Sequence, residues 1–330
     1  MGAFSLVLGR HHRNSDTSDL PYSYLLENSD ESYLVPAINL RSVGTTRDAR
    51  KWPIRDRRKG PKHLDHIIFN LLSPYSVQKI IKGIDILNHL KKSAENANGF
   101  YTYNGVRIEE KSLVRGLELY KLGLIKFLGN GLLKKLEVGN YATEEEMRKA
   151  LSSSALNGEQ SWVDMAGLIV PKEKVNQLIM SIESGEVSDL GTLNSFFSTW
   201  KDHYFDWVWN WTVARLQSEI QLDLQTVKVP EIIAFVKEWE SAVVGLDKMM
   251  YEDARKEFTL KSQTGFGIDG SNDTKALDFE NVRGGFSSHP DVVGILKHID
   301  KKTKLANFVI SKLENVMENS SSVNIASNEI

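Results

Sequence analysis

The 330-residue sequence contains no cysteine. This absence excludes disulfide frameworks, thiolate metal sites, iron–sulfur clusters and cysteine nucleophiles, and it favours a reducing compartment. No run approaches the roughly 18 consecutive apolar residues that a membrane-spanning helix needs. The apolar stretch after Met1 is short and has no basic residues ahead of it, unlike a signal peptide. We therefore expect a cytoplasmic protein that does not insert into a membrane.

The usual signatures of catalytic and metal sites are missing as well. No H-E-x-x-H, G-x-S-x-G, P-loop or kinase motif occurs. His63 and His66 have the i, i+3 spacing of two ligands on a helix, but no third ligand accompanies them, so we predict neither a metal site nor a cofactor. His11 and His12 end an expected strand, where neighbours point to opposite faces, so at most one could act as a general base. We take His11 as that candidate.

Three short segments near the N-terminus have the composition of strands. Residues 4–8, 23–26 and 32–35 are rich in aromatic and aliphatic side chains, and turn-forming residues separate them. Three short strands cannot enclose a core alone, so we expect a small sheet packed on a larger body. An unpaired strand edge tends to recruit another chain, and we expect residues 4–8 to form such an edge.

From residue 73 onward, apolar residues recur with helical spacing. The pattern predicts one helix starting at Ser73-Pro74, a second over roughly 108–137, and others near 171–184, 190–222, 230–258 and 291–317. Gly129-Asn130-Gly131 predicts a kink or break in the second helix, and Thr143 with three following glutamates predicts a capping box.

The expected fold class is therefore mainly α (α+β), with a small β-rich N-terminal layer packed on a multi-helix body. We divide the chain into a β-rich segment (1–45), a basic connecting segment (46–72), a helical domain (73–317) and a polar tail (318–330) expected to be disordered.

Charge is distributed unevenly along the chain. Residues 41–62 hold nine lysines and arginines against two aspartates, a net charge of +7, whereas the whole chain carries −2, which leaves −9 for all other residues. Arginine binds phosphate bidentately, and a neighbouring aromatic ring can stack on a ligand. The candidate anion-binding residues are Arg47, Arg50, Lys51, Trp52, Arg55, Arg57 and Arg58.

The basic segment has other interpretations. Its arginines could pair with acids of the helical body, because the residues outside the segment carry a net negative charge. They could also lie on a solvated surface. We do not expect nucleic acid as a partner, because the remaining surface would repel phosphate.

A glycine-rich loop and an aromatic run complete the candidate features. Gly265, Gly267 and Gly270, with Asp269, match G-x-G-x-x-G, but a helix is expected before them where a dinucleotide site needs a strand. We expect a loop that ends a helix and lines a pocket.

The aromatic run spans residues 196–211. Five of its side chains share one face of the expected helix, and we expect them to lie in the core: Phe197, Trp200, Tyr204, Trp207 and Trp211. We also expect His203 to be a buried core histidine.

Several strings resemble a known family: GRHHRNSDTSDLPYSYLLE (9–27), NLRSVGTTRDARKWPIRDRR (39–58), NLLSPYSVQKIIKGIDIL (70–87), TGFGIDG (264–270) and DFENVRGGF (278–286). They are similar to the C-terminal half of a family of uncharacterised bacterial proteins classed as a domain of unknown function. The resemblance implies that longer members carry a left-handed hexapeptide β-helix ahead of this region, which this chain does not have. Such β-helices are associated with sugar-nucleotide, acyl and nucleotidyl transfer.

Two functional hypotheses follow. In the first, the chain is a helical module that binds a phosphate or sugar nucleotide and works with a β-helix transferase. In the second, it is a non-catalytic helical interaction or oligomerisation module. The expected partners are a phosphorylated small molecule and, at residues 4–8, a second copy of the chain or a β-helix subunit. Whether the chain is an enzyme stays open at this stage, because fold does not imply function.

Overall fold

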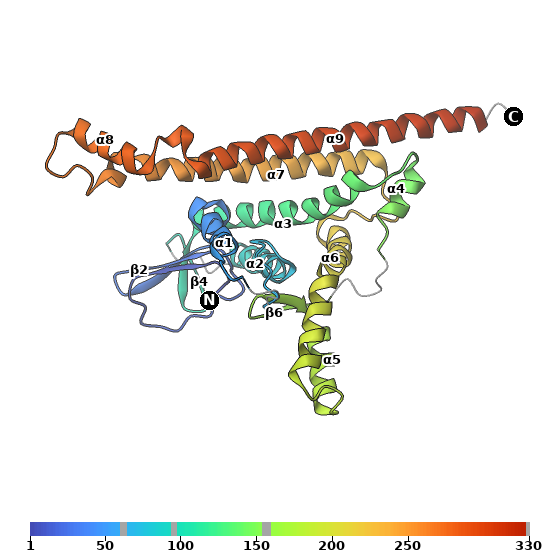
Figure 1. The fold of residues 1–330 in the computed structure, drawn as a ribbon, viewed down its shortest axis with the longest axis horizontal. Coiled ribbons are helices and arrows are strands. Elements are labelled where there is room, and N and C mark those ends of the chain that lie inside the picture. The colour runs from blue at the N-terminus through green and yellow to red at the C-terminus, as the bar shows by residue number, and fades with distance from the viewer. Residues whose placement is uncertain (60–64, 94–97, 154–159, 328–330) are drawn as a thin grey trace.

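The computed structural model describes residues 1–59, 65–93, 98–153 and 160–327. It is mainly helical with a small mixed sheet built largely by the N-terminal residues, which confirms the predicted fold class. Figure 1 shows two long helices, α7 (Val229–Arg255) and α9 (Pro290–Ser327), packed side by side along the length of the molecule. Helix α3 (Glu110–Val138) runs beneath them, and α2 (Pro74–Lys92) packs on α3.

The N-terminal sheet has five strands in the order β1-β2-β3-β5-β4. The three predicted strands are β1 (Leu6–Leu8), β2 (Tyr24–Asn28) and β3 (Glu31–Val35), with β1 at one edge and parallel to β2. The other two, β4 (Phe100–Tyr103) and β5 (Val106–Glu109), form a hairpin that the sequence analysis missed. At its turn Asn104 and Gly105 both have positive φ, as a two-residue hairpin turn requires.

The helical body follows local sequence signals at most of its ends. Ser73 accepts a hydrogen bond from the Ser76 N–H at the start of α2, and Thr143 forms the predicted capping box with Glu146 at α4 (Glu144–Ala150). The remaining elements are α1 (Val43–Arg55), α5 (Lys172–Glu183), α6 (Leu190–Ile220), α8 (Asn272–Arg283), the hairpin β6 (Trp162–Met165) and β7 (Leu168–Pro171), and the short 3-10 helices η1 (Ile38–Arg41), η2 (Lys256–Phe258), η3 (Leu260–Gln263) and η4 (Phe286–Ser288).

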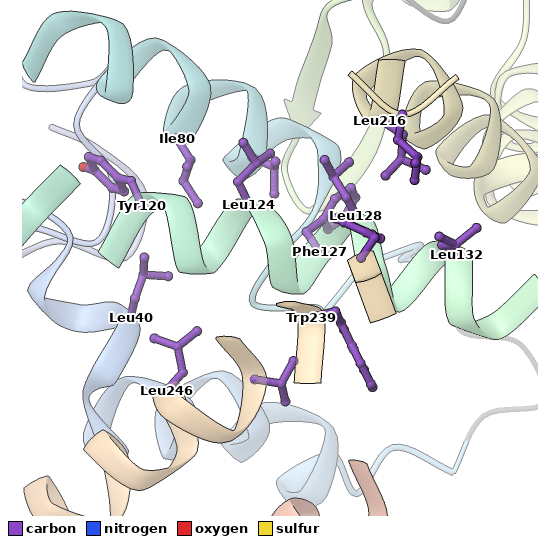
Figure 2. Close-up of a cluster of buried hydrophobic side chains, with 14 of the residues drawn as sticks. Leu40, Ile80, Tyr120, Leu124, Phe127, Leu128, Leu132, Leu216, Trp239 and Leu246 are labelled. Carbon is purple, nitrogen blue, oxygen red and sulfur yellow. The ribbon is translucent and has the colours of Figure 1, made fainter. Parts of the chain in front are cut away.

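The break predicted at Gly129-Asn130-Gly131 is wrong, because α3 continues through these residues, whereas the kink stays a prediction. The two glycines allow neighbouring side chains to pack closely on α3. A Cβ added to Gly129 would lie 2.1 Å from Cδ1 of Trp239, and one added to Gly131 would lie 3.0 Å from Cγ2 of Thr212. Figure 2 shows Trp239 of α7 beneath α3, with Leu124 and Leu128 on the side of α3 that faces Ile80 of α2.

Two element ends lie outside the expectations above. Helix α8 starts directly after the glycine-rich loop, where Ser271 accepts a hydrogen bond from the Thr274 N–H. The tail expected to be disordered from residue 318 is helical as far as Ser327, because α9 continues past that point, and residues 328–330 lie outside the described residues. Within the residues described, no helix combines the length and the apolar character needed to cross a membrane.

Candidate anion-binding site

Helix α1 carries most of the described basic segment, and its arginines have different surroundings. Arg47 lies against the body, where its Nε donates to Asp291 Oδ2 at 2.7 Å and its Nη2 donates to Glu257 at 3.1 Å. These acids stand more than 200 residues away along the chain. The two pairs attach α1 to the start of α9 and to η2, so Arg47 holds the fold together at this point.

Lys51 and Arg58 also contact acids, but within the basic segment itself or just after it. Lys51 donates to Asp48 at 2.9 Å, and Arg58 donates to Asp56 and, at 2.7 Å, to Asp65. Exposed pairs of this kind contribute little to stability, because solvent screens them. They reduce the charge that these two cations could offer a ligand.

Trp52, Arg55 and Arg57 are exposed, Trp52 to 53%. The two arginines make no ion pair with the described residues, and Lys62 lies outside those residues. An anion-binding role for the whole segment therefore stays a prediction. Within the described residues, the seven candidates do not all line the cavity that Arg50 lines.

Of the seven candidate anion-binding residues, Arg50 lines the cavity described next. The cavity has a volume of about 330 Å³ and lies where α1, α3, α7 and α9 meet. Thr46 and Ala49 of α1 line it with Arg50, and the extended residues before α2, Phe69 to Leu72, form a further wall. This volume is at the lower end of the usual range for small-molecule sites, about 300–1,000 Å³.

A cluster of charged residues also lines the cavity. Asp247 of α7 is 1% exposed, and its Oδ2 lies 2.6 Å from Nδ1 of His298 on α9. Its other oxygen, Oδ1, lies 3.9 Å from Nζ of Lys126 on α3 and is buried with no hydrogen-bond partner among the described residues. Lys126, Asp247 and His298 all line the cavity. One carboxylate thus sits between a lysine and a histidine from different helices.

The electrostatics of the cluster favour an anion. Burial lowers the pKa of Lys126, Asp247 offsets this only in part, and the nearby positive charge of Arg50 lowers the pKa further. Burial and then repulsion by Lys126 lower the pKa of Lys302, whose Nζ donates to Oδ1 of the cavity residue Asn130 at 3.2 Å. Three cations therefore share one carboxylate, and a bound anion would relieve their repulsion.

The sequence analysis did not identify this cluster. The apolar stripe of α7 includes Val243, Leu246 and Met250, and Asp247 follows Val243 by four residues on the same buried face. A buried acid within an apolar stripe requires a partner, so the position of Asp247 in the sequence could have predicted a buried ion pair or hydrogen bond. The partners on α3 and α9 could not be chosen from the sequence, since several lysines and histidines compete for the role.

The candidate base His11 lies away from these four helices, at the N-terminal sheet. Its Nδ1 is 2.8 Å from Oγ of Ser32, and its Nε2 is buried with no hydrogen-bond partner in the part of the chain that the structure describes. The adjacent His12 is 3.2 Å from Asp30 and lines a cavity of about 340 Å³ with Arg13 and others. A catalytic role for His11 stays a prediction.

The glycine loop lies between η3 and α8. Gly265 and Gly267 have positive φ, which explains the need for glycine, and the Gly267 N–H donates to Asp278 at 2.9 Å. A helix precedes the loop, as predicted, so the context of a dinucleotide site is missing. Gly265, Gly267, Asp269 and Gly270 are not among the residues that line the cavity beside Arg50.

The aromatic run lies on α6. Trp200, Tyr204 and Trp211 are buried, as predicted, whereas Phe197 and Trp207 are only half-buried. The expectation for His203 is wrong: its ring is exposed and stacks on Trp207, because it lies on the side of α6 that meets solvent.

His66 is near Oγ of Ser198, and His63 is outside the described residues. No group of three or more potential metal ligands occurs among the residues that the structure describes.

The fold and this site define a mainly helical protein with a small sheet, in which four helices border a cavity lined by Arg50 and Lys126. Residues 143–313 match the family described as Domain of unknown function (DUF6819), and residues 1–91 match Domain of unknown function (DUF4954). The chain belongs to the DUF6819 family, whose match covers more than half of it. No curated protein and no solved structure matches the chain.

These matches confirm the expected resemblance to proteins classed as domains of unknown function. The residues that line the cavity come from both matched regions and from the stretch between them. Arg50 lies in the first matched region, Asp247 and His298 lie in the second, and Lys126 lies between the two. The cavity therefore requires both regions in one folded unit.

Proposed function

We propose that the chain binds a phosphorylated small molecule in the cavity between α1, α3, α7 and α9. The observation that carries the proposal is the excess of cations around Asp247: Arg50 and Lys126 line the cavity, and Lys302 stands behind Asn130. Arg50 presents a planar fork suited to phosphate, and Lys126 supplies a point charge in a partly desolvated wall. Arg50 retains its role from the first hypothesis, whereas Arg47 acts within the fold.

The binding site can be tested with two arginines of the same helix. Arg50 and Arg55 are both exposed and unpaired within the described chain, but only Arg50 lines the cavity. We expect Arg50→Gln to weaken the binding of inorganic phosphate or a sugar phosphate at least about tenfold, since a charge-assisted hydrogen bond is worth about 1.5–3 kcal/mol. Arg55→Gln should leave the affinity unchanged. Isothermal titration calorimetry measures both.

A thermal-shift screen against nucleotides and sugar phosphates identifies the ligand for that titration. A ligand at about 100 times its dissociation constant stabilises the native state by about 2.7 kcal/mol. Equal losses in the Arg50→Gln and Arg55→Gln variants would contradict the cavity site and favour the basic segment as a diffuse charged surface.

The family resemblance supplies a context for this binding. We propose that the chain acts in a bacterial cytoplasm beside a hexapeptide β-helix transferase, to which it would present a sugar nucleotide or a related phosphate.

A second candidate function is that of an interaction module. Phe4, two residues before the edge strand β1, and Leu6 and Leu8 within it are exposed to 41, 41 and 50%. Apolar side chains on an unpaired edge favour pairing with another chain. This candidate does not require a ligand, and it is compatible with the ion pairs that Arg47 makes inside the chain.

Light scattering during size-exclusion chromatography tests this candidate. We expect the wild-type chain to self-associate at micromolar concentration and the double variant Leu6→Lys, Leu8→Lys to be a monomer, because charged side chains block edge pairing. Leu296→Lys, at an exposed position of α9, is the control and should behave as the wild type. A wild-type monomer would contradict self-association through β1.

A further inference from the structure

We propose that His298 is a nucleophile that accepts a phosphoryl group from a small-molecule phosphoryl donor bound in the cavity. The inference rests on the proposed phosphate site and goes beyond it, because it assigns a reaction to a residue that binding alone does not need. His298 lies on α9 and lines the cavity together with Arg50 of α1 and Lys126 of α3.

The contact with Asp247 determines which nitrogen of His298 can react. The buried carboxylate is an acceptor, so the 2.6 Å contact places a proton on Nδ1, which donates to Oδ2. The neutral ring then carries its lone pair on Nε2. That atom makes no hydrogen bond with the described residues. It is also not fully buried. Nε2 is therefore open to a molecule in the cavity.

The same carboxylate fixes a cation beside the nucleophile. Lys126 is 3.9 Å from Oδ1 while His298 contacts Oδ2, so the two side chains flank one buried group. Arg50 of α1 also lines the cavity. Two cations next to an oriented imidazole can hold the phosphoryl oxygens and stabilise the charge that they carry during transfer.

The step balances without any further reactant. The Nε2 lone pair forms the N–P bond, the P–O bond to the leaving group breaks, and the leaving group departs with that electron pair. With an acyl phosphate as donor, the leaving group is a carboxylate and needs no proton. The Nδ1 proton stays between His298 and Asp247, whose negative charge stabilises the cationic phosphoimidazole.

A purely structural role for the pair is the competing interpretation. A buried Asp–His contact could serve only to join α7 to α9, which pack along most of their length. That role predicts no difference in reactivity between His298 and an exposed histidine. His203 is the matched comparison, since it also lies near a carboxylate, 3.9 Å from Asp206, but on the exposed side of α6.

The test exposes the folded full chain to acetyl phosphate and maps acid-labile, alkali-stable phosphorylation by peptide mass spectrometry. We expect His298 to be modified at least about tenfold faster than His203, because the bound donor is held next to Nε2. Inorganic phosphate should slow the reaction at His298 and leave His203 unaffected. His298→Gln should abolish the fast modification, and His203→Gln should not change it.

Two results would overturn the inference: equal rates at His298 and His203, or a fast reaction at His298 that inorganic phosphate does not slow. Asp247→Asn adds a check on orientation and should slow the modification of His298. If this variant does not fold, the competition by phosphate in the wild-type chain still decides. Phosphate affinity separates this failure from failure of the proposed function, because a site that binds phosphate without phosphorylation at His298 contradicts the nucleophile alone.

Discussion

Replacing Trp239 with alanine is expected to lower the free energy of unfolding by about 3–5 kcal/mol, the usual loss for a large aromatic residue deleted from a core. Trp239 is fully buried and packs directly on Gly129 of α3. Its Nε1 donates to Asn130 at 3.2 Å, and Lys302 lies 5.3 Å from the ring. The side chain thus joins α7 to α3 and borders the residues of the proposed site. Chemical denaturation measures the effect.

Trp52→Ala is the control for this prediction. Trp52 is half exposed on α1 and has no comparable packing, so its removal should change stability by no more than about 0.5 kcal/mol. Similar losses for the two variants would mean that the contact between α7 and α3 is not the core shown in Figure 2.

Substituting alanine for Gly129 is expected to destabilise the protein by about 1–3 kcal/mol through overpacking. The added Cβ would lie 2.1 Å from Cδ1 and 2.9 Å from Cβ of Trp239, distances that the backbone and ring cannot keep. Helix propensity acts in the opposite direction, since alanine is the better helix former. Steric conflict with a fully buried ring is the larger effect here.

Gly245→Ala separates these two contributions. Gly245 lies inside α7, and a Cβ there would have no atom within 4 Å, so the variant should be stabilised by about 0.5–1 kcal/mol. In a Trp239→Ala background, the cost of Gly129→Ala should disappear, because the ring that it strikes is gone. Additive effects of the two substitutions would contradict direct contact between Gly129 and Trp239.

Local sequence signals were sufficient for much of the fold. The apolar runs predicted β1 to β3, and Ser73-Pro74 and Thr143 predicted two helix starts that hydrogen bonds confirm. The missed hairpin of β4 and β5 also had a local signal, the Asn104-Gly105 pair, which went unused. In contrast, no local signal shows that Gly129 faces a tryptophan more than 100 residues away, so it was taken for a helix breaker.

The candidate site was harder to predict for the same reason. The basic segment was visible as a charge excess, but its acids could not be assigned, since Arg47 pairs with residues 210 and 244 positions away. Only the packing of α1 against α7 and α9 separates Arg47, which is paired, from Arg50, which lines the cavity. Burial of Asp247 was implied by the stripe on α7, whereas its contacts with Lys126 and His298 depend on how three helices pack.

The most direct test of the account is a crystal of the protein soaked in tungstate, a phosphate analogue that anomalous scattering locates. The account predicts an anomalous peak inside the cavity, within hydrogen-bond distance of Arg50 and next to Lys126 and His298. An empty cavity, with peaks only at the exposed Arg55 and Arg57, would contradict it.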